Sequence, residues 1–485
     1  MAENEETLLL KSSQVEYDEN CPGCKVDRRK AQNPNIPWLH FSFIWIITLS
    51  SSLPISSIFP FLYYMVRDFH IAKREEDISF YAGFEGSAFM VGRFLTALLW
   101  GMVADRYGRK TVMILSMIAI VIFNTLFGLS TSYWMALTMR FLLGAFCGVL
   151  GPMRAYATEV SRQEHQALGI ATLSSAWGIG LVIGPALGGY LAQPADKFPN
   201  IFSQESVFGR TINCRFPYFL VCLVISIFAL IVLIICFWLP ETLHSHDVED
   251  AALIDSDDLE KSHSAEGRTS NTWLSLLRNW PLMSVIIIYC VFQLHDMAYI
   301  EIFSLWAVSP KAFGGLSLAT EDVGQALAVA GVGLLLCQLL LYPVFERAFG
   351  PIIVSRTGAA LSIALLSCYP FIAKLSGTSL SLVIDLVSAL KNAFSISVTA
   401  GLFLLQNRAV RQRQRGAANG LALCMMSLCK AVGPAAAGSL LSWGQSRQNA
   451  SFLPGSHMVF FILNVVELIG FLMTFKPFLA EPNRD

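Results

Sequence analysis

Twelve long apolar runs constrain the fold of this chain more than any other feature of its sequence. Each has the roughly 17 to 25 residues that a helix needs to cross the hydrocarbon core of a bilayer. Charged residues make up 14% of the chain, against about 25% in a typical soluble domain, so lipid must solvate most of it. We therefore predict an all-α integral membrane protein with 12 transmembrane helices. The runs cover approximately residues 41–66, 79–103, 111–131, 133–157, 166–191, 216–239, 281–305, 322–345, 352–373, 379–405, 416–442 and 457–478.

A polar segment splits these runs into two sets of six. Residues 240–280 are rich in Asp, Ser and His and hold too few apolar residues to fold alone, which predicts a linker. The sequence thus predicts two pseudo-symmetric halves of six helices. The expected organisation is a tail of residues 1–40, a first half of residues 41–239, the linker, a second half of residues 281–478 and a tail of residues 479–485.

The distribution of Lys and Arg predicts how the chain sits in the membrane. An even number of spans places both termini on one side. The tails and loops of that side hold about twice as many Lys and Arg as the opposite loops, which predicts that both termini are cytosolic. The net charge of −1 leaves no basic surplus for a nucleic-acid partner.

The stretch Trp100-Gly-Met-Val-Ala-Asp-Arg-Tyr-Gly-Arg-Lys110 places an Asp, two Arg and a Lys in a turn between the second and third runs. Charge at a hydrocarbon boundary is costly unless water or partner groups receive it. Glycine allows the backbone to turn tightly and two helices to approach closely. Anchoring at the lipid headgroups is one interpretation of these charges.

The fifth run carries Gly180-Leu-Val-Ile-Gly-Pro-Ala-Leu-Gly-Gly189, with glycines at spacings of four on one helix face. Small residues permit close packing, and the proline removes an internal hydrogen bond and allows a bend. The eleventh run, which is the equivalent span of the second half, repeats the pattern as Gly433-Pro-Ala-Ala-Ala-Gly438. Residues 345–350 echo the charged turn more faintly. The repeat supports two related halves.

Both patterns resemble motifs of the major facilitator superfamily of transporters. Cys21-Pro-Gly-Cys24, Pro240-Glu-Thr-Leu-His244 and Leu294-His-Asp296 extend the resemblance to the plant zinc-induced facilitator-like family, over essentially the whole chain. This resemblance implies the major facilitator fold, whose halves meet at a midplane cavity lined by helices one, four, seven and ten. It also implies that the Gly-Pro pattern marks a proton-coupled antiporter. The antiporter residues are Gly180, Gly184, Pro185, Gly188 and Gly189.

The resemblance gives the charged turn a second interpretation besides headgroup anchoring. It implies that Asp105 belongs to a charge latch that holds a cytosolic gate closed. The gating residues are Gly101, Asp105, Arg106, Gly108, Arg109 and Lys110.

Ionisable side chains inside the apolar runs are functional candidates because charge in a membrane is expensive. We expect an acid near Arg140 to carry a coupling proton, with Asp296 as first choice and Glu85 or Glu301 as alternatives. A fixed interhelical ion pair is the competing interpretation. Arg93 and Glu467 are further ionisable residues of this kind. The candidate set for the proton-coupling and substrate cavity is Arg140, His295, Asp296, Glu301, Glu85, Asp385 and Lys391.

Four thiol and imidazole side chains fall in predicted cytosolic segments, namely Cys21, Cys24, His244 and His246. Two thiolates and two imidazoles would suit tetrahedral zinc. The alternative interpretation is a redox-inert turn and a flexible linker. Many of the remaining cysteines lie in apolar runs, where they behave as small hydrophobic residues, and no other cofactor is expected.

These features predict a monomeric secondary active transporter, namely a proton-coupled antiporter that works by alternating access. The resemblance implies that its substrate is zinc or a small chelator such as nicotianamine or a mugineic acid. A cavity with both cations and carboxylates favours the zwitterionic chelator, because bare Zn²⁺ would want more His and carboxylate ligands. Other organic ions, such as auxin-like anions and drugs, and potassium stay open as alternatives.

Two other classes of function are weighed against transport. A nutrient sensor usually carries long signalling extensions, and here the tails are short. An enzyme is not expected, because the runs contain no catalytic triad or catalytic metal cluster. The stretch Glu5-Glu-Thr-Leu-Leu-Leu10 fits an acidic dileucine sorting pattern, and an ordinary disordered tail is the competing interpretation. The dileucine pattern and the family resemblance point to the vacuolar membrane or the plasma membrane.

Overall fold

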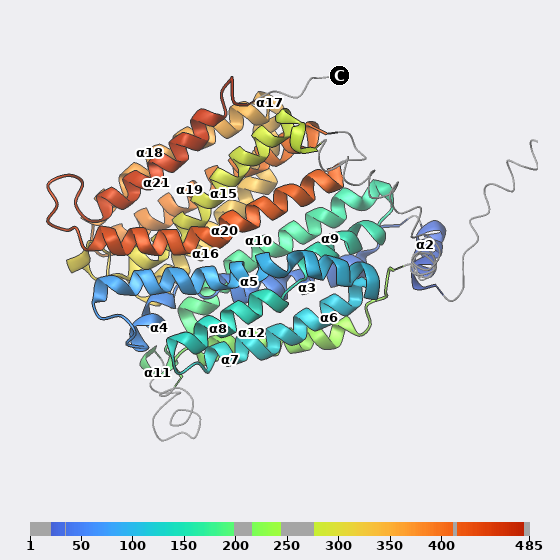
Figure 1. Ribbon diagram of the computed structural model, residues 1–485, viewed down its shortest axis with the longest axis horizontal. Coiled ribbons are helices and arrows are strands. Elements are labelled where there is room, and N and C mark those ends of the chain that lie inside the picture. The colour runs from blue at the N-terminus through green and yellow to red at the C-terminus, as the bar shows by residue number, and fades with distance from the viewer. Residues whose placement is uncertain (1–20, 34, 198–215, 244–275, 411–414, 480–485) are drawn as a thin grey trace, which may run out of the picture.

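The computed structural model describes residues 21–33, 35–197, 216–243, 276–410 and 415–479, and the regular elements of these segments are helical (Figure 1). In this part of the chain, ten helices are long and apolar enough to cross a membrane. An eleventh is α5 (Ile78–Tyr107), which bends by 50° between Ala97 and Leu99. Helix α16 (Thr320–Leu336) falls outside this count by itself, but it continues through a π-helix (Cys337–Leu341) into α17 (Tyr342–Phe349), and we assign the three together to the twelfth predicted span.

The helices form two halves of six spans each. The first half contains α3 (Trp38–Ser56) with α4 (Leu62–Asp68), α5, α6 (Arg109–Ala119) with a π-turn (Ile120–Asn124) and α7 (Thr125–Gly128), α8 (Tyr133–Phe146) with α9 (Leu150–Glu159), α10 (Gln166–Leu191) and α12 (Phe219–Cys236). The second half contains α15 (Trp280–Val308), α16 with α17, α18 (Pro351–Ile372), α19 (Thr378–Arg408), α20 (Arg415–Gln445) and α21 (Ser456–Met473).

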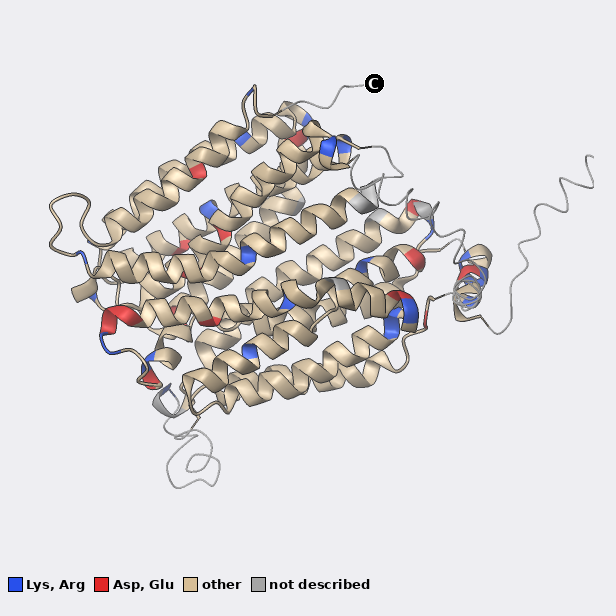
Figure 2. Ribbon diagram, in the orientation of Figure 1, with Lys and Arg blue, Asp and Glu red and all other residues tan. Residues whose placement is uncertain are grey.

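Two short helices mark the opposite ends of the bundle. Helix α2 (Pro22–Gln32) lies at the end that carries the charged turn, and α11 (Pro194–Lys197) lies at the other end, near α4 (Figure 1). We name the first end the motif face and the second end the far face. Figure 2 shows Lys, Arg, Asp and Glu at both faces and also within the helices between them.

The halves pack against each other through two helix pairs, α5 with α20 and α10 with α16. Glycines permit both contacts. A Cβ atom on Gly83 of α5 would lie 2.9 Å from the Cα atom of Gly438, and a Cβ atom on Gly189 of α10 would lie 2.9 Å from the Cα atom of Gly324. Any larger residue would push the halves apart at these points.

Polar contacts join the halves toward the far face. Between described residues, the Tyr64 hydroxyl donates to the Leu318 carbonyl at 2.9 Å, and the Ser79 hydroxyl donates to Gln445 at 3.1 Å. The Lys197 ammonium donates to the Thr320 hydroxyl at 2.7 Å. The two halves are therefore fastened at the far face in this structure.

The glycines of the predicted antiporter motif lie at two helix interfaces. Cβ atoms on Gly180, Gly184 and Gly188 would each collide with a serine of the first span, so these three residues face that span. The Ser56 hydroxyl also donates to the Gly180 carbonyl at 2.8 Å. Gly189 faces α16 instead. The pattern thus packs α10 against its own half and against the other half.

Two predicted spans are broken rather than continuous. Residues 41–66 were expected to form one helix, but α3 ends at Ser56 and α4 begins at Leu62. Residues 133–157 divide at Cys147 and Gly148, between α8 and α9. The carbonyl of Ala145, at the end of α8, accepts hydrogen bonds from Trp100 Nε1 at 2.7 Å and from the Thr96 hydroxyl at 2.8 Å. These side chains replace helical partners, which lets the break persist in the membrane.

The charged turn is shorter than predicted. Asp105 and Arg106 belong to the last turn of α5, Arg109 is the first residue of α6, and Gly108 alone makes the corner with φ of +102°. Gly350 makes the equivalent corner between α17 and α18 with φ of +79°. Glycine adopts positive φ without strain. The faint echo of the charged turn at residues 345–350 is therefore a repeat of its backbone geometry.

Candidate functional site

Three ionisable side chains lie near enough to interact electrostatically where the two halves join, and we name them the Arg140 cluster. Glu85 on α5 and Glu301 on α15 both interact electrostatically with Arg140 on α8. The three residues are only 1%, 0% and 2% exposed, respectively. Glu85 and Arg140 belong to the first half and Glu301 to the second, so the cluster bridges the halves.

The local backbone explains how Arg140 is held. Helix α3 ends at Ser56, and the last carbonyls of a helix have no partner within it. Arg140 Nη1 donates to one of them, the Pro54 carbonyl, at 2.8 Å. The rings of Phe89 and Phe127 each lie 5.4 Å from the Arg140 guanidinium carbon, which adds cation–π contacts. The break in the first span therefore provides a fixed acceptor for the buried arginine.

The two carboxylates of the cluster are poorly satisfied. Among the described residues, none makes a hydrogen bond to any of the four carboxylate oxygens of Glu85 and Glu301. One guanidinium interacts electrostatically with two carboxyl groups, so two ionised acids would leave a net negative charge in a buried site, which is costly. One proton shared between the acids neutralises the cluster. The arrangement therefore suits the binding and release of a proton.

A second group, the Asp296 cluster, lies within the second half. Lys391 Nζ on α19 lies 2.9 Å from Asp296 Oδ1 on α15. His295 Nδ1 lies 3.8 Å from the same oxygen, and His295 Nε2 lies 3.5 Å from Glu467 Oε2 on α21. The Lys391 ammonium also lies 4.0 Å from the centre of the Tyr299 ring. The predicted residues Asp296, His295 and Lys391 are thus gathered around an ion pair with Lys391, not around Arg140.

Asp385 lies apart from both clusters. It accepts a hydrogen bond of 3.0 Å from Gln325 Nε2 on α16. The sequence predicts it in one candidate cavity with Arg140 and Lys391. Six residues separate Asp385 from Lys391, and at about 100° per residue these two side chains leave α19 on different faces. A place on the same helix therefore did not bring Asp385 into the cluster of Lys391.

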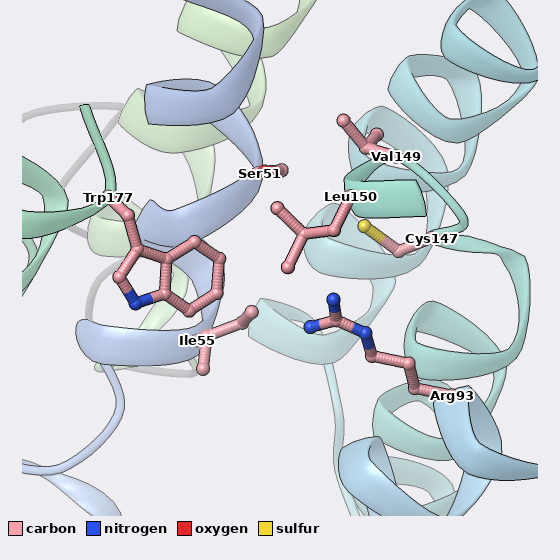
Figure 3. Close-up of a pocket in the computed structure, with 7 residues that line it drawn as sticks. All are labelled: Ser51, Ile55, Arg93, Cys147, Val149, Leu150 and Trp177. Carbon is pink, nitrogen blue, oxygen red and sulfur yellow. The ribbon is translucent and has the colours of Figure 1, made fainter. Parts of the chain in front are cut away.

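Three cations of the interior were not in the predicted set. Arg93 on α5 lines a pocket with Trp177, Cys147 and Leu150 (Figure 3). Arg154 on α9 and Lys430 on α20 each interact electrostatically with Arg93. Arg93 was visible as an intramembrane charge, whereas Arg154 lies close to a predicted span end and Lys430 lies in the Gly-Pro repeat. No sequence periodicity indicated that these three cations lie near enough to interact.

The predicted gating residues form a network within the first half. Arg109 lies 2.7 Å from Asp105 Oδ1 through Nη1 and 3.0 Å from Glu159 Oε1 through Nη2. The Asp105 side chain is 75% exposed. Lys110 Nζ donates to the Phe237 carbonyl at 2.7 Å. These partners all belong to the first half, so a latch between the halves stays a prediction.

Glu241 of the Pro-Glu-Thr-Leu motif is the residue at the motif face that sequence reasoning missed. Its Oε1 and Oε2 atoms accept from the backbone N–H groups of Arg109 and Lys110 at 2.9 and 3.0 Å. It thereby satisfies two N–H groups at the start of α6 that have no helical acceptor. A Cβ atom on Gly108 would collide with this carboxylate. Gly108 thus has two roles: it forms the tight turn between α5 and α6, and it leaves room for the Glu241 carboxylate that caps α6.

The cysteine pair lies on a docked segment of the tail. Cys21 and Cys24 are buried, and the Gly23 N–H between them donates to the Leu243 carbonyl at 3.1 Å. Arg162 Nε donates to the Lys30 carbonyl at 2.7 Å, which fixes the other end of α2. His244 and His246 lie outside the described residues. Among the described residues, no group of three or more His, Cys, Asp or Glu side chains is placed to hold a metal ion.

Comparisons with known proteins decide the family. A model of the Major Facilitator Superfamily matches residues 44–434. The chain is 55% identical over 493 residues to Protein ZINC INDUCED FACILITATOR 1 of Arabidopsis thaliana, and the match covers 100% of both chains. The chain belongs to the zinc-induced facilitator-like family of this superfamily. It is therefore a multi-pass membrane transporter.

Further likenesses agree with this membership. The facilitator is 55% identical over 486 residues to Protein ZINC INDUCED FACILITATOR-LIKE 1 of the same plant, over 99% of each chain. A bacterial homologue of the human lysosomal transporter Spinster, solved in an inward-facing and occupied conformation, matches it with a TM-score of 0.66 at 16% identity. That match covers 91% of this facilitator and 96% of the bacterial chain, and it confirms the predicted major facilitator fold.

Proposed function

We propose that this facilitator is a proton-coupled antiporter that works by alternating access, and that the Glu85–Glu301 pair carries the coupling proton. The supporting observation is the Arg140 cluster, where one guanidinium interacts electrostatically with two carboxyl groups whose four oxygens lack hydrogen bonds among the described residues. Glu301 belongs to a different half from Glu85 and Arg140. A rocking motion of the halves changes these separations, and so links proton affinity to conformation.

The Arg140 cluster replaces Asp296 as our choice for the proton carrier. Asp296 has a cation 2.9 Å away in Lys391, so a proton on Asp296 breaks an ion pair and leaves a buried cation uncompensated. A proton on Glu85 or Glu301 instead removes surplus negative charge. The competing view, a fixed ion pair that only holds helices together, fits the Asp296 cluster better than the Arg140 cluster.

The proposed cargo is a small metal chelator or zinc, moved out of the cytosol in metal homeostasis. We place both termini in the cytosol, and the protein, as a monomer, in the vacuolar or plasma membrane. The motif face is then cytosolic. The hydrogen bonds that fasten the halves toward the far face support a state that is closed away from the cytosol.

Proteoliposomes with an imposed pH gradient test the proposal. Flux of radiolabelled nicotianamine, its zinc complex and free Zn²⁺ is measured in the unaltered protein and in Glu301→Gln and Glu85→Gln. We expect gradient-driven flux that falls to the level set by the substrate gradient alone in both variants, while exchange of substrate across the membrane continues. Asp385→Asn is the matched control, because it neutralises an acid outside the cluster and retains the Gln325 contact.

Normal coupling in both Gln variants would overturn the assignment of the proton site. Gradient-driven flux of auxin-like anions, drugs or potassium, with none for chelator or zinc, would replace the proposed cargo. If no candidate moves in response to the gradient, the antiporter proposal fails, and a substrate-binding sensor becomes the better account.

A further inference from the structure

Three cations of the interior form no ion pair with a carboxylate of the described residues. Arg93, Arg154 and Lys430 lie on α5, α9 and α20, within the spans, and each side chain is partly exposed rather than buried. None of them makes a hydrogen bond or an ion pair with a described residue. Their donor groups therefore have no partner in the part of the chain that the structure describes, and each residue retains some exposed surface.

The packing of α5 against α20 places Arg93 and Lys430 near each other. Gly83 meets Gly438, and the Ala435 N–H donates to the Ser87 hydroxyl at 2.8 Å, so the two helices run antiparallel. Following this register toward the motif face brings Lys430 opposite the turn of α5 that precedes Arg93. The two cations thus lie on facing helices of opposite halves.

Arg154 approaches from the broken fourth span. Leu150 lines the pocket of Arg93 (Figure 3), and Arg154 follows Leu150 by one helical turn on α9. Arg154 interacts electrostatically with Arg93, with Lys430 and with Tyr289 on α15. Helices of both halves thus bring positive charge to one region.

The charge balance of this region is positive. Asp296 is the carboxylate that interacts with Lys430, and it is already paired with Lys391 at 2.9 Å. Unpaired cations in a membrane interior repel one another and are costly, unless an anion or water receives them. The region therefore favours a ligand that brings negative charge.

We propose that Arg93, Arg154 and Lys430 form a subsite that binds the carboxylate groups of the transported substrate. This inference rests on the proposed function, because it assigns part of the same substrate a binding place. The planar fork of an arginine suits a carboxylate bidentately, and the lysine adds a point charge. The substrate class is a compact acid with two or more carboxylates, and free Zn²⁺ does not occupy this subsite.

The subsite lies apart from the proton site. Arg93 follows Glu85 by eight residues on α5, which is about 12 Å along a helix axis. Substrate and proton therefore do not compete for the same atoms. Their exchange is coupled through the movement of the halves, because Lys430 and Glu301 belong to one half and Arg93 and Glu85 to the other.

Binding to the full-length protein in lipid nanodiscs, at fixed pH and without a gradient, tests the subsite. The probes are nicotianamine and citrate, with the methyl ester of citrate as the uncharged control and ZnCl₂ as the cation control. We expect Arg93→Gln, Arg154→Gln and Lys430→Gln each to weaken citrate and nicotianamine binding by about tenfold or more. The charge-retaining Lys430→Arg should keep most of the affinity, and Lys374→Gln, a change of a far-face cation, should keep all of it.

Thermal unfolding distinguishes a ligand site from a structural one. Removing one of three repelling cations should leave the midpoint of unfolding unchanged or raise it, whereas loss of a structural partner lowers it. Parental affinity for both acids in all three Gln variants overturns the subsite. So does the absence of saturable citrate and nicotianamine binding to the unaltered protein, or binding of the methyl ester that equals that of citrate.

The two proposals fail separately. Lost acid binding in the Gln variants, without gradient-driven flux in proteoliposomes, retains the subsite and rejects the antiporter. Gradient-driven flux, together with unchanged acid affinity in the Gln variants, retains the antiporter and rejects the subsite.

Discussion

The Glu301 carboxylate lies against Gly86 on the opposite half of the protein, where a Cβ atom would be 2.8 Å from Glu301 Oε2. The absence of a side chain at Gly86 is what allows the second half to bring its acid next to Glu85. One glycine thus sets the distance between two carboxyl groups that share one arginine. This relationship leads to the first prediction.

Gly86→Ala should impair proton-driven transport more than it impairs stability. The added methyl group displaces the Glu301 carboxyl group from the Arg140 cluster. Small displacements of reacting groups slow a reaction strongly. We expect gradient-driven flux in proteoliposomes to fall by about tenfold or more. Gly420→Ala is the control, because a Cβ atom there meets nothing within 4 Å. Unchanged flux in Gly86→Ala would show that the position of Glu301 does not matter for coupling.

Asp296→Asn should destabilise the protein without abolishing coupling. The change leaves Lys391 buried without its ion-pair partner, which costs about 3 kcal/mol or more. The double variant with Lys391→Met should recover much of that loss. Thermal unfolding of the singles and the double, compared with Asp385→Asn, measures the effect. A single variant as stable as the double would contradict the structural role of this pair.

Glu241→Ala should loosen the start of α6. It removes the acceptor for the N–H groups of Arg109 and Lys110, which costs about 1–2 kcal/mol for a helix cap. Glu346→Ala, in the equivalent corner of the second half, should cost less than about 1 kcal/mol because Glu346 makes a surface ion pair with Arg408. Equilibrium unfolding of the two variants in detergent compares them. Equal losses would mean that Glu241 acts as an ordinary surface charge.

Trp100→Phe should destabilise the non-helical segment that interrupts the fourth span. The indole N–H donates to the Ala145 carbonyl at 2.7 Å, and phenylalanine keeps the ring while removing that donor. We expect a loss of about 1 kcal/mol and faster hydrogen exchange of backbone amides around Gly148. Trp134→Phe is the matched control, because Trp134 is 64% exposed. Identical exchange rates in the two variants would show that the Thr96 hydroxyl suffices as a donor.

The spans and the family were predictable because each rests on local pattern. Apolar runs of membrane-crossing length need no tertiary information, and neither do the Gly-Pro repeat or the charged turn. The breaks at residues 57–61 and 147–149 were not predictable, because the donors that satisfy their carbonyls, such as Arg140 and Trp100, come from other helices. The residues of the proposed proton site were in the predicted set. The way these residues group was not predictable, because a position along an apolar run fixes the height of a side chain in the membrane but not the direction in which it points.

By itself, the sequence determined that this protein is a twelve-span facilitator with two related halves, since hydrophobic length and short motifs are properties of the chain alone. The tertiary structure decided which charges are neighbours. It brought Glu301 of one half near Glu85 of the other, paired Asp296 with Lys391, and brought Arg93, Arg154 and Lys430 near enough to interact. Those choices depend on helix rotation and on the close approaches that Gly83, Gly86 and Gly189 permit, and packing across the halves sets both.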